Sequence, residues 1–540
     1  MSYLDRPRLT FFGRFTANPS TINNTPSNYD TAKPLGDLAW NPEGRHNFSL
    51  DDCAVTGVAF DGDPGDTSGS VVTSQAGVLV DLDPDQQMVS QIIGMKLTVT
   101  VGGGSVSGTF QPTNFTDIFV RPNTSVTGDG QFSAFYQSVL THLHWNAKGS
   151  PFLTTLEALS PTLLSIKFNV DGYHDHVWVG GDFTRGRVAG TIGPHLHDEP
   201  ASFVNARLLR PTTFQSQYGS FNYAPAKTRL THNKIVFDLD NAVPTFWPNS
   251  QSWPVSQPVP LQAVLLPANG DPIPIGWLDT SEAAYETTAF VQELTLPPGA
   301  TSLLPTTPTG IVSPNDASKK TPNPIVLQEN PTGAYVNFDQ YVWRLDPGQT
   351  AKIAITANIF EKPVAGASIG LTLGGFGPGT AKPAKALMFP KSVPLGPAGR
   401  ATFEVTTKDP GNPRDFIDGQ VYAISPSWSA DTNPDGNTQI SIHLFDQVKV
   451  PAQPTWWQDV FPILRQYARL YPAMDKIIQL DVYEAIVANI MRIVERLNLP
   501  EDDPGYMPIT RELSASKKAI ILTWAKNGTP EGTRPKGKKK

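Results

Sequence analysis

The chain has 540 residues, which is enough for about three or four domains that each bury a core of their own. Its 51 prolines and 44 glycines are spread between short apolar runs, as is typical of an all-β protein with many turns. The net charge of −7 argues against a nucleic-acid-binding surface, the single cysteine excludes an internal disulfide, and no apolar run is long enough to span a membrane.

Residues 1–230 are expected to form an N-terminal β domain built from short strands. Many of its runs alternate apolar and polar residues, as at residues 8–17 and 164–170. Length alone leaves the segment at residues 133–145 open between a helix and a strand. The strand-like run at residues 205–211 is expected to close the domain. The N-terminal segment carries several charges and no apolar stretch of the secretory type, so we expect a cytoplasmic protein.

Two further β regions are expected to follow. Residues 231–347 form the second, and residues 297–330 within it are so rich in Pro, Thr and Ser that we expect a long surface loop. Residues 348–452 contain short strands about ten residues apart, joined by turns with Pro and Gly, which predicts an immunoglobulin-like β-sandwich. Modules of this type support or bind more often than they catalyse.

Residues 453–528 change to helical periodicity. Apolar residues recur at helical spacing over 460–471 and again over 482–497, where Asp481 is expected to cap the second helix. A third helix is expected to begin after Ser514.

The helical segment is expected to pack on the preceding sandwich through Trp456 and Trp457 and to stop at Gly528. Residues 529–540 end in a basic run and are expected to form a solvated, disordered tail. The chain is therefore predicted to be mainly β, with multi-domain β-sandwiches that include an immunoglobulin-like domain, and with a short C-terminal α-helical segment.

Six of the nine histidines form three His-x-His pairs between residues 136 and 210. Histidines two residues apart on a strand share a face, and three imidazoles, or two with a carboxylate, suit a divalent transition metal. The pattern fits surface or hydrogen-bonded histidines equally well, because nothing in the sequence shows that the pairs converge. The candidate metal ligands are His142, His144, His174, His176, His195, His197 and Glu199.

Three other patterns allow chemistry but have plainer interpretations. Arg185 and Arg187 in a glycine-rich stretch could hold a carboxylate or phosphate, or could be exposed arginines of a hairpin. Ser368 lies in a Gly-x-Ser-x-Gly string, which catalyses only as a strand-to-helix turn, and here a strand-like run follows it. A sugar-binding face or a sandwich edge would both account for three tryptophans, namely Trp247, Trp253 and Trp277.

Four segments of the chain together carry a resemblance to a known family. They are MSYLDRPRLTFFGRF at the N-terminus, NARLLRP at 205–211, RQYARLYPAMDKIIQLDVYE at 465–484 and YMPITRELSASKKAIIL at 506–522. The sequence resembles the N-terminal, non-ferritin half of iminophenyl-pyruvate dimer synthases, large proteins of violacein and indolocarbazole assembly that couple two tryptophan-derived imines. The string Tyr-Met-Pro-x-Thr-Arg-Glu-Leu-Ser is the most specific part of this resemblance.

The resemblance implies an absence as well. In those synthases a ferritin-like, iron-binding region follows this string, and we expect the present chain to lack it. The only Glu-x-x-His in the sequence is Glu43-Gly-Arg-His46 in a loop-like stretch, so no iron ligand and no catalytic residue is carried over.

The leading hypothesis is an accessory or scaffold protein of secondary metabolism that acts beside a separate ferritin-like or amino-acid-oxidising enzyme. A metal-dependent enzyme with its site at residues 142–199 and a carbohydrate-binding module are the alternatives that the sequence leaves open.

Overall fold

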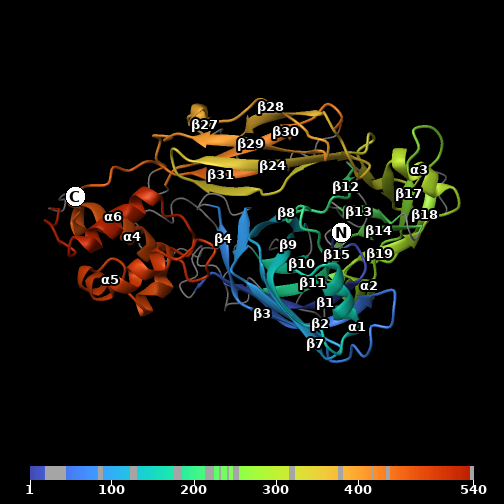
Figure 1. The fold of residues 1–540 in the computed structure, drawn as a ribbon, viewed down its shortest axis with the longest axis horizontal. Coiled ribbons are helices and arrows are strands. Elements are labelled where there is room, and N and C mark those ends of the chain that lie inside the picture. Colours follow the sequence, from blue (N-terminus) through green and yellow to red (C-terminus); the bar gives the residue numbers. More distant parts are fainter. Residues whose placement is uncertain are drawn as a thin grey trace.

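The structure, a computed structural model, divides into four units along the chain. They are a β-barrel, a curled sheet (the second unit), a pair of facing sheets (the two-sheet unit) and a C-terminal group of helices (the helical unit), as Figure 1 shows. The fold is mainly β with C-terminal helices, which confirms the predicted class at that level. The residues described are 1–18, 44–82, 89–121, 131–174, 185–212, 224–229, 233–239, 242–246, 255–314, 323–374, 381–414, 418–432 and 438–535.

The N-terminal unit is a closed barrel and not a sandwich. Consecutive strands pair antiparallel around the ring, and β11 pairs back to β1, so the barrel has an up-and-down order. Three strands are long and bent, because β3 with β4, β5 with β6 and β7 with β8 each share the same two neighbouring strands. The strands are β1 (Arg8–Asn18), β2 (Asn47–Ala59), β3 (Val71–Gln75), β4 (Gly77–Asp81), β5 (Ser90–Ile93), β6 (Lys96–Val101), β7 (Gly104–Phe110), β8 (Thr113–Arg121), β9 (Gln131–Asn146), β10 (Leu164–His174) and β11 (Arg185–Pro194).

Aromatic side chains fill the barrel interior. Phe168 stacks on Tyr136 with ring centroids 4.8 Å apart and on Phe48 with ring centroids 6.1 Å apart. Gly190 must lack a side chain, because a Cβ there would lie 2.3 Å from the ring of Phe11. The helix α1 (Pro151–Leu159) closes one end of this core by burying Phe152, Leu153 and Leu156. The ambiguous segment at residues 133–145 is a strand, β9.

The second unit is an eight-stranded sheet that begins earlier in the chain than expected. The run at residues 205–211 does not close the first domain: β12 (Arg207–Pro211) and β13 (Ala224–Arg229) already belong to the second sheet. The Pro-rich segment at 297–330 is not one long loop either, since it contributes α3 (Ala300–Leu303), β20 (Thr309–Val312) and β21 (Ile325–Glu329). The other elements are β14 (Lys234–Asp238), β17 (Leu261–Leu265), β18 (Ile273–Leu278), α2 (Glu282–Thr288) and β19 (Val291–Thr295), with the separate pair β15 (Thr245–Phe246) and β16 (Val255–Ser256).

The two-sheet unit consists of two five-stranded sheets that share one core. Ile353 and Phe403 from one sheet and Tyr422 and Ile442 from the other are buried together in this core. The first sheet holds β22 (Ala334–Phe338), β24 (Thr350–Ile359), β25 (Lys362–Pro363), β27 (Leu387–Met388) and β29 (Arg400–Thr407). The second holds β23 (Val342–Leu345), β26 (Ser368–Gly374), β28 (Ser392–Pro394), β30 (Gln420–Ser427) and β31 (Ile440–Leu444), and β23 pairs with β31 in parallel.

The helical unit has its own apolar core. Trp456 packs on Trp524 at 5.8 Å inside this core, so it does not anchor the first helix to the sandwich as expected. Ser514 caps the last helix as predicted, whereas Val482 and not Asp481 precedes the second. The unit comprises a π-helical turn (Trp456–Val460), α4 (Phe461–Leu470), a 3₁₀ turn (Pro472–Lys476), α5 (Tyr483–Leu497) and α6 (Ala515–Lys526).

The segment after α6 is better ordered than its composition predicts. The backbone N–H of Trp456 donates to the carbonyl oxygen of Pro530 at 2.9 Å, and the hydroxyl of Tyr483 donates to the carbonyl oxygen of Thr529 at 2.7 Å. Residues 529–533 therefore belong to the helical unit, so the prediction of a disordered tail over residues 529–540 is wrong for this part, and residues 536–540 lie outside the described residues.

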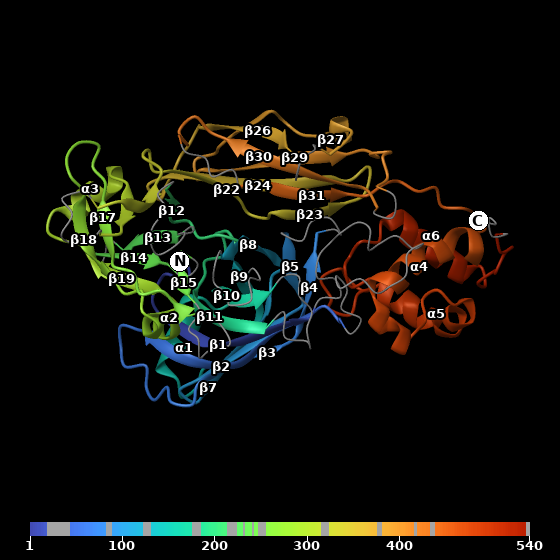
Figure 2. The same cartoon turned by 180° about the vertical axis from the view of Figure 1, so that it is seen from behind.

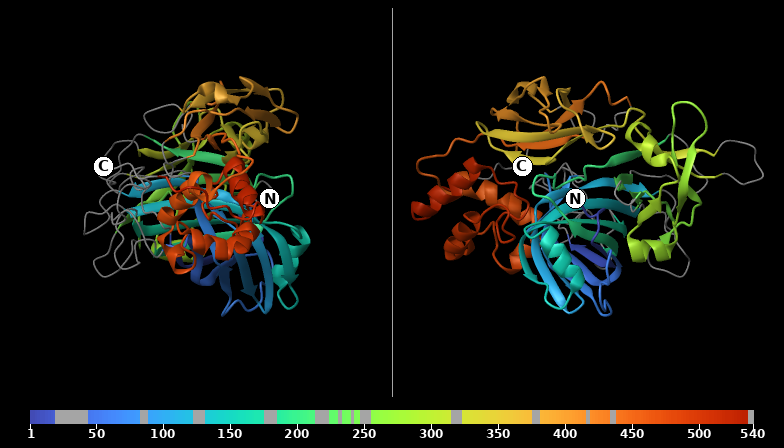
Figure 3. Two further views of the ribbon diagram at one scale, coloured as in Figure 1. Left: turned by 90° about the vertical axis from the view of Figure 1, so that its left-hand side faces the viewer. Right: turned by 45° about the vertical axis from the view of Figure 1, so that its right-hand side comes forward.

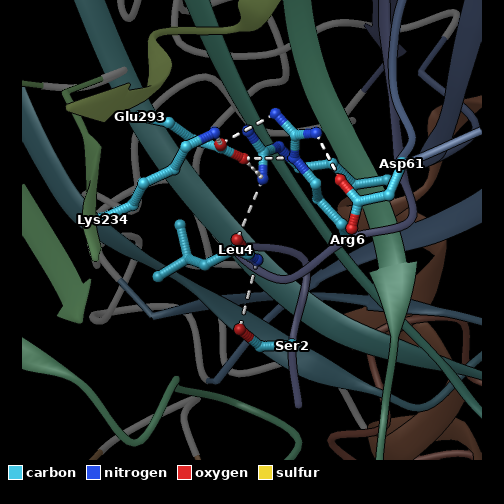
Figure 4. A network of polar contacts seen from close by, with 7 residues as sticks. Ser2, Leu4, Arg6, Asp61, Lys234 and Glu293 are labelled. Atoms are coloured by element: carbon cyan, nitrogen blue, oxygen red, sulfur yellow. Dashed lines mark hydrogen bonds and ion pairs between the residues drawn. The ribbon is translucent and has the colours of Figure 1, made fainter. Parts of the chain in front are cut away.

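The two-sheet unit lies along one side of both the barrel and the second unit, and the helical unit projects at one end (Figures 2 and 3). The barrel and the second unit are joined through Glu293, as Figure 4 shows. Arg6 donates two hydrogen bonds of 2.8 Å to this carboxylate, while Arg8 and Lys234 each approach it to 2.9 Å. Burial by itself would raise the pKa of Glu293, but these three cations lower it well below its ordinary value.

Candidate functional site

The first histidine pair lies exposed on β9. His142 and His144 both point to solvent, and a ring nitrogen of His142 lies 3.1 Å from the hydroxyl of its neighbour Thr141. Register shifts between β7 and β9 at this point, and the positive φ of His142 (51°) accompanies this irregularity. The pair is therefore held on an irregular strand edge and not in a pocket.

The third pair is divided between the interior and the surface. His195 is buried at the end of β11, where Nε2 donates to the carbonyl oxygen of Glu199 at 3.3 Å, and burial lowers its pKa. His197 is exposed, and the carboxylate of Glu199 pairs with the terminal amine of Met1. Glu199 thus already has a cationic partner.

The second pair lies at the end of β10 and in the segment that follows it. Only the backbone of His174 is described, as the last residue of β10, and His176 lies outside the described residues. Among the residues that are described, no group of three or more His, Cys, Asp or Glu side chains lies close enough to hold a metal ion. A metal set would therefore need at least one ligand from outside the described residues, and the predicted metal site stays a prediction.

Of the other sequence patterns, Arg187 fits neither of its two interpretations, since it is not an exposed arginine of a hairpin either. Arg187 is not open to a ligand, because it is buried and makes two hydrogen bonds to Asp171, of 2.6 and 2.9 Å. Ser368 is exposed at the first position of β26, so no strand-to-helix turn presents it. Trp277 is 58% exposed on β18, and Trp247 and Trp253 lie outside the described residues.

The most unusual group of titratable side chains lies elsewhere, where the barrel, the two-sheet unit and the helical unit meet. We call it the three-way joint, and it consists of His46, Arg344, Tyr467, Tyr471 and residues 506–514. All four named side chains are buried or nearly so, and the string on which the family resemblance chiefly depends forms the remainder.

Arg511 shapes the string at residues 506–514. Its backbone adopts a positive φ of 57°, and its guanidinium donates to the carbonyl oxygens of Glu501 at 3.1 Å and Asp503 at 2.7 Å. Burial lowers the pKa of this arginine. The guanidinium of Arg511 thus stabilises its own loop. This loop places Ile509 against Val78, Val80 and Ile93 of the barrel.

Tyr471 connects the helical unit to the barrel. Its ring meets the imidazole of His46 edge to face at 5.2 Å, and Nδ1 of His46 donates to the carbonyl oxygen of Leu79 at 3.0 Å. Burial, reinforced by the negative charge of Glu512, raises the pKa of Tyr471 well above its ordinary value, and that of Tyr467 likewise. Both phenols are therefore neutral at any physiological pH.

Arg344 links the two-sheet unit to the barrel from the other side. It donates to the side-chain oxygen of Gln91 at 2.7 Å and to the carbonyl oxygen of Asp81 at 2.6 Å. Burial lowers its pKa to about 10, and the charge of Glu512 opposes this effect. Arg344 and Glu512 are both withdrawn from water, which costs desolvation free energy that an apolar pair would not incur.

The chemistry available at the three-way joint is limited. Clustered groups with shifted pKa values are typical of functional sites, but structural ion-pair networks shift pKa values too. The polar groups described above donate mainly to backbone carbonyls and side chains of the neighbouring units, and the tyrosines and His46 are buried. The joint is suited to fixing how three units sit against one another.

Sequence reasoning found only part of this site. The resemblance pointed to residues 506–514, and Tyr467 and Tyr471 stand four residues apart on the predicted helical stripe. No sequence pattern connects them to His46 or to Arg344, which come from distant parts of the chain.

No protein-family model and no curated protein matches the sequence. None of the helices in the described part of the chain is long and apolar enough to cross a membrane.

Proposed function

We propose that this chain is an accessory or scaffold protein, related to the iminophenyl-pyruvate dimer synthases, that acts beside a separate oxidative enzyme in secondary metabolism. The observation that chiefly supports the proposal is the position of residues 506–514. The string that resembles the family is buried at the three-way joint and fixes the helical unit on the barrel and the two-sheet unit.

The bond pattern of the joint supports a positioning role. The backbone N–H of Ala515, at the start of α6, donates to Asp346 of the two-sheet unit at 2.9 Å, and Lys517 pairs with Asp418 at 3.1 Å. Such contacts orient the helical unit, and an enzyme that docks on it would be held in a defined place. We further take the two-sheet unit to be an immunoglobulin-like module, whose usual role is support or binding.

A reconstitution tests the proposal. Tryptophan and an amino-acid oxidase are supplied with this protein alone, with a ferritin-like coupling enzyme alone, and with both. We expect no coupled dimer from this protein alone, co-elution of this protein with one of the two enzymes, and a higher dimer yield when both are present.

Two variants make the reconstitution specific. His46→Ala with Tyr471→Ala loosens the helical unit and should remove the gain in dimer yield, whereas His142→Ala with His144→Ala changes only exposed side chains and should keep it. Dimer formation by this protein alone would contradict the accessory role. The absence of both co-elution and a gain in yield would contradict a partner of this class.

A further inference from the structure

The outer wall of the barrel that faces the second unit is polar where a domain interface is ordinarily apolar. Along β10, Ile166, Phe168 and Val170 point into the barrel core, and the alternate residues face the second unit. These alternate residues are fully or almost fully buried, and they are Ser165, Lys167, Asn169 and Asp171. Together with Thr191, opposite Lys167 on β11, they form what we call the polar seam.

The charged members of the polar seam are paired within the protein. Lys167 donates to Asp238 of β14 at 3.0 Å and to the carbonyl oxygen of Ala289 at 2.9 Å. Asp171 accepts two hydrogen bonds from Arg187. The charges of Lys167 and Asp171 are therefore each neutralised by a protein partner. A charged ligand bound beside them would be a buried ion without a partner of opposite charge.

The neutral members have no protein partner among the described residues. Both amide atoms of Asn169, the hydroxyl of Ser165 and the hydroxyl of Thr191 are buried and lack a hydrogen bond to the described part of the chain. Native proteins satisfy nearly all buried polar atoms, because an unmet hydrogen bond costs the full desolvation of its group. Four such atoms along one face of β10 and β11 indicate bound guest molecules.

The spacing of Ser165, Asn169 and Thr191 allows a cluster of several small molecules to reach all three side chains. Ser165 and Asn169 each stand two residues from Lys167 on the same face, roughly 7 Å along the strand, and Thr191 lies opposite Lys167. An amide and two hydroxyls both donate and accept hydrogen bonds. A guest that satisfies them must do the same, must be uncharged and must be small.

We infer that Ser165, Asn169 and Thr191 bind ordered water, which forms a hydrated site sealed between the barrel and the second unit. Buried water commonly makes about three hydrogen bonds to otherwise unpaired groups, which matches the groups offered here. The site would make the interface between the two units specific in register, because sliding one past the other would break the water contacts. It lies apart from the three-way joint and does not depend on the proposed function.

The experiment uses a crystal structure of the whole protein together with melting temperatures of matched variants. Thr191→Val removes a hydroxyl of the polar seam, and Thr113→Val removes a buried hydroxyl that has a protein partner, the carbonyl oxygen of Gln137 at 2.7 Å. We expect ordered water within hydrogen-bond distance of Asn169, and a lower melting temperature for both variants, by similar amounts.

A dry seam makes the opposite prediction. Thr191→Val and Asn169→Leu would then remove only unpaired polar groups, so both would melt at a higher temperature than the parent. That result, or a crystal structure with well-defined water elsewhere in the interior and none at Asn169, would overturn the inference. If Asn169→Leu fails to fold, Ser165→Ala with Thr191→Val supplies the same comparison.

Discussion

The imidazole of His46 and the phenol ring of Tyr471 meet edge to face with their centroids 5.2 Å apart, although they come from opposite ends of the chain. His46 belongs to the barrel and Tyr471 ends α4 of the helical unit. We therefore expect protonation of His46 to weaken the docking of the helical unit on the barrel.

The first prediction concerns acid pH. Burial lowers the pKa of His46 to about 4 from an ordinary value of 6.5, against the opposing effect of the hydrogen bond to the Leu79 carbonyl and with a lesser further lowering by Arg511. The unfolded chain therefore binds a proton between pH 6.5 and 4 that the folded chain does not. We expect stability to be full above pH 6.5 and to fall towards pH 4 by on the order of 3 kcal/mol from this residue.

The measurement is the free energy of unfolding of His46→Phe between pH 7 and 4. Its pH dependence should be flatter than that of the parent, while His144→Phe, at an exposed position, should match the parent. An unchanged slope in His46→Phe would show that His46 is accessible to protons in the folded protein.

The second prediction has the opposite sign. Burial raises the pKa of Glu329 to about 6, against the opposing effects of Arg207 and of the Thr309 hydrogen bonds. The folded protein then binds the extra proton, so the contribution of Glu329 is full below pH 4.5 and is lost as pH rises through 6. The loss amounts to about 2 kcal/mol. Glu329→Gln should therefore gain stability relative to the parent between pH 4.5 and 7, as measured by urea unfolding.

Exposed Glu404→Gln is the matched control, since it lies in the two-sheet unit and should show no such gain with pH. A Glu329→Gln curve parallel to the parent would mean that Arg207 keeps Glu329 ionised throughout this pH range.

The third prediction concerns the buried pair Lys167–Asp238. Lys167→Met removes the ammonium and leaves a buried carboxylate, which should cost about 3–5 kcal/mol of stability. The double variant Lys167→Met with Asp238→Leu should recover much of this loss, because neither charge remains. Urea unfolding of the two single variants and the double variant gives the coupling energy, and simple additivity would contradict the pairing.

A partly exposed ion pair provides the comparison. Asp61 lies 2.6 Å from Arg6 but is largely open to solvent, so Asp61→Asn should cost no more than about 1 kcal/mol.

The fourth prediction concerns the paired histidines and any bound metal. Because His142 and His144 are exposed, their replacement by alanine should change the free energy of unfolding by no more than about 0.5 kcal/mol. It should also leave the metal content of the purified protein, measured by elemental analysis, unchanged. His195→Ala should destabilise more, because His195 is buried.

Loss of a stoichiometric metal from the His142→Ala/His144→Ala variant would contradict this expectation. It would show that these histidines share a metal with residues outside the described part of the chain, of which His176 is the obvious candidate. The variant His174→Ala with His176→Ala tests that possibility directly.

The sequence predicted local structure well where one period dominated. Alternation along residues 164–170 predicted a strand, which is β10, and the stripe at residues 482–497 identified α5. Closure of the barrel could not be predicted, because the pairing of β11 with β1 joins segments about 175 residues apart and leaves no local trace.

Composition misled where turn residues lie inside strands. Residues 297–330 are rich in Pro and Thr, yet Thr309 is buried in β20 and its hydroxyl donates to Glu329 at 3.1 Å. Contacts made in the folded protein, such as that between Thr309 and Glu329, decide the conformation there. No pattern within residues 297–330 predicts these contacts. The same limit applies to the three-way joint, where the resemblance marked the string at 506–514 and missed Arg344.

The bent strands of the barrel have a mechanical consequence. β4 and β5 continue directly from strands that enclose the aromatic core, and their outer face receives Ile509, while Gly94 between β5 and β6 lies against Pro504. A force that pulls the helical unit away would therefore load the hydrogen-bond ladders of the barrel in shear. The helical unit and the barrel core are in this sense in series, so that a displacement at Ile509 or Pro504 acts on strands whose continuations enclose the stacked rings.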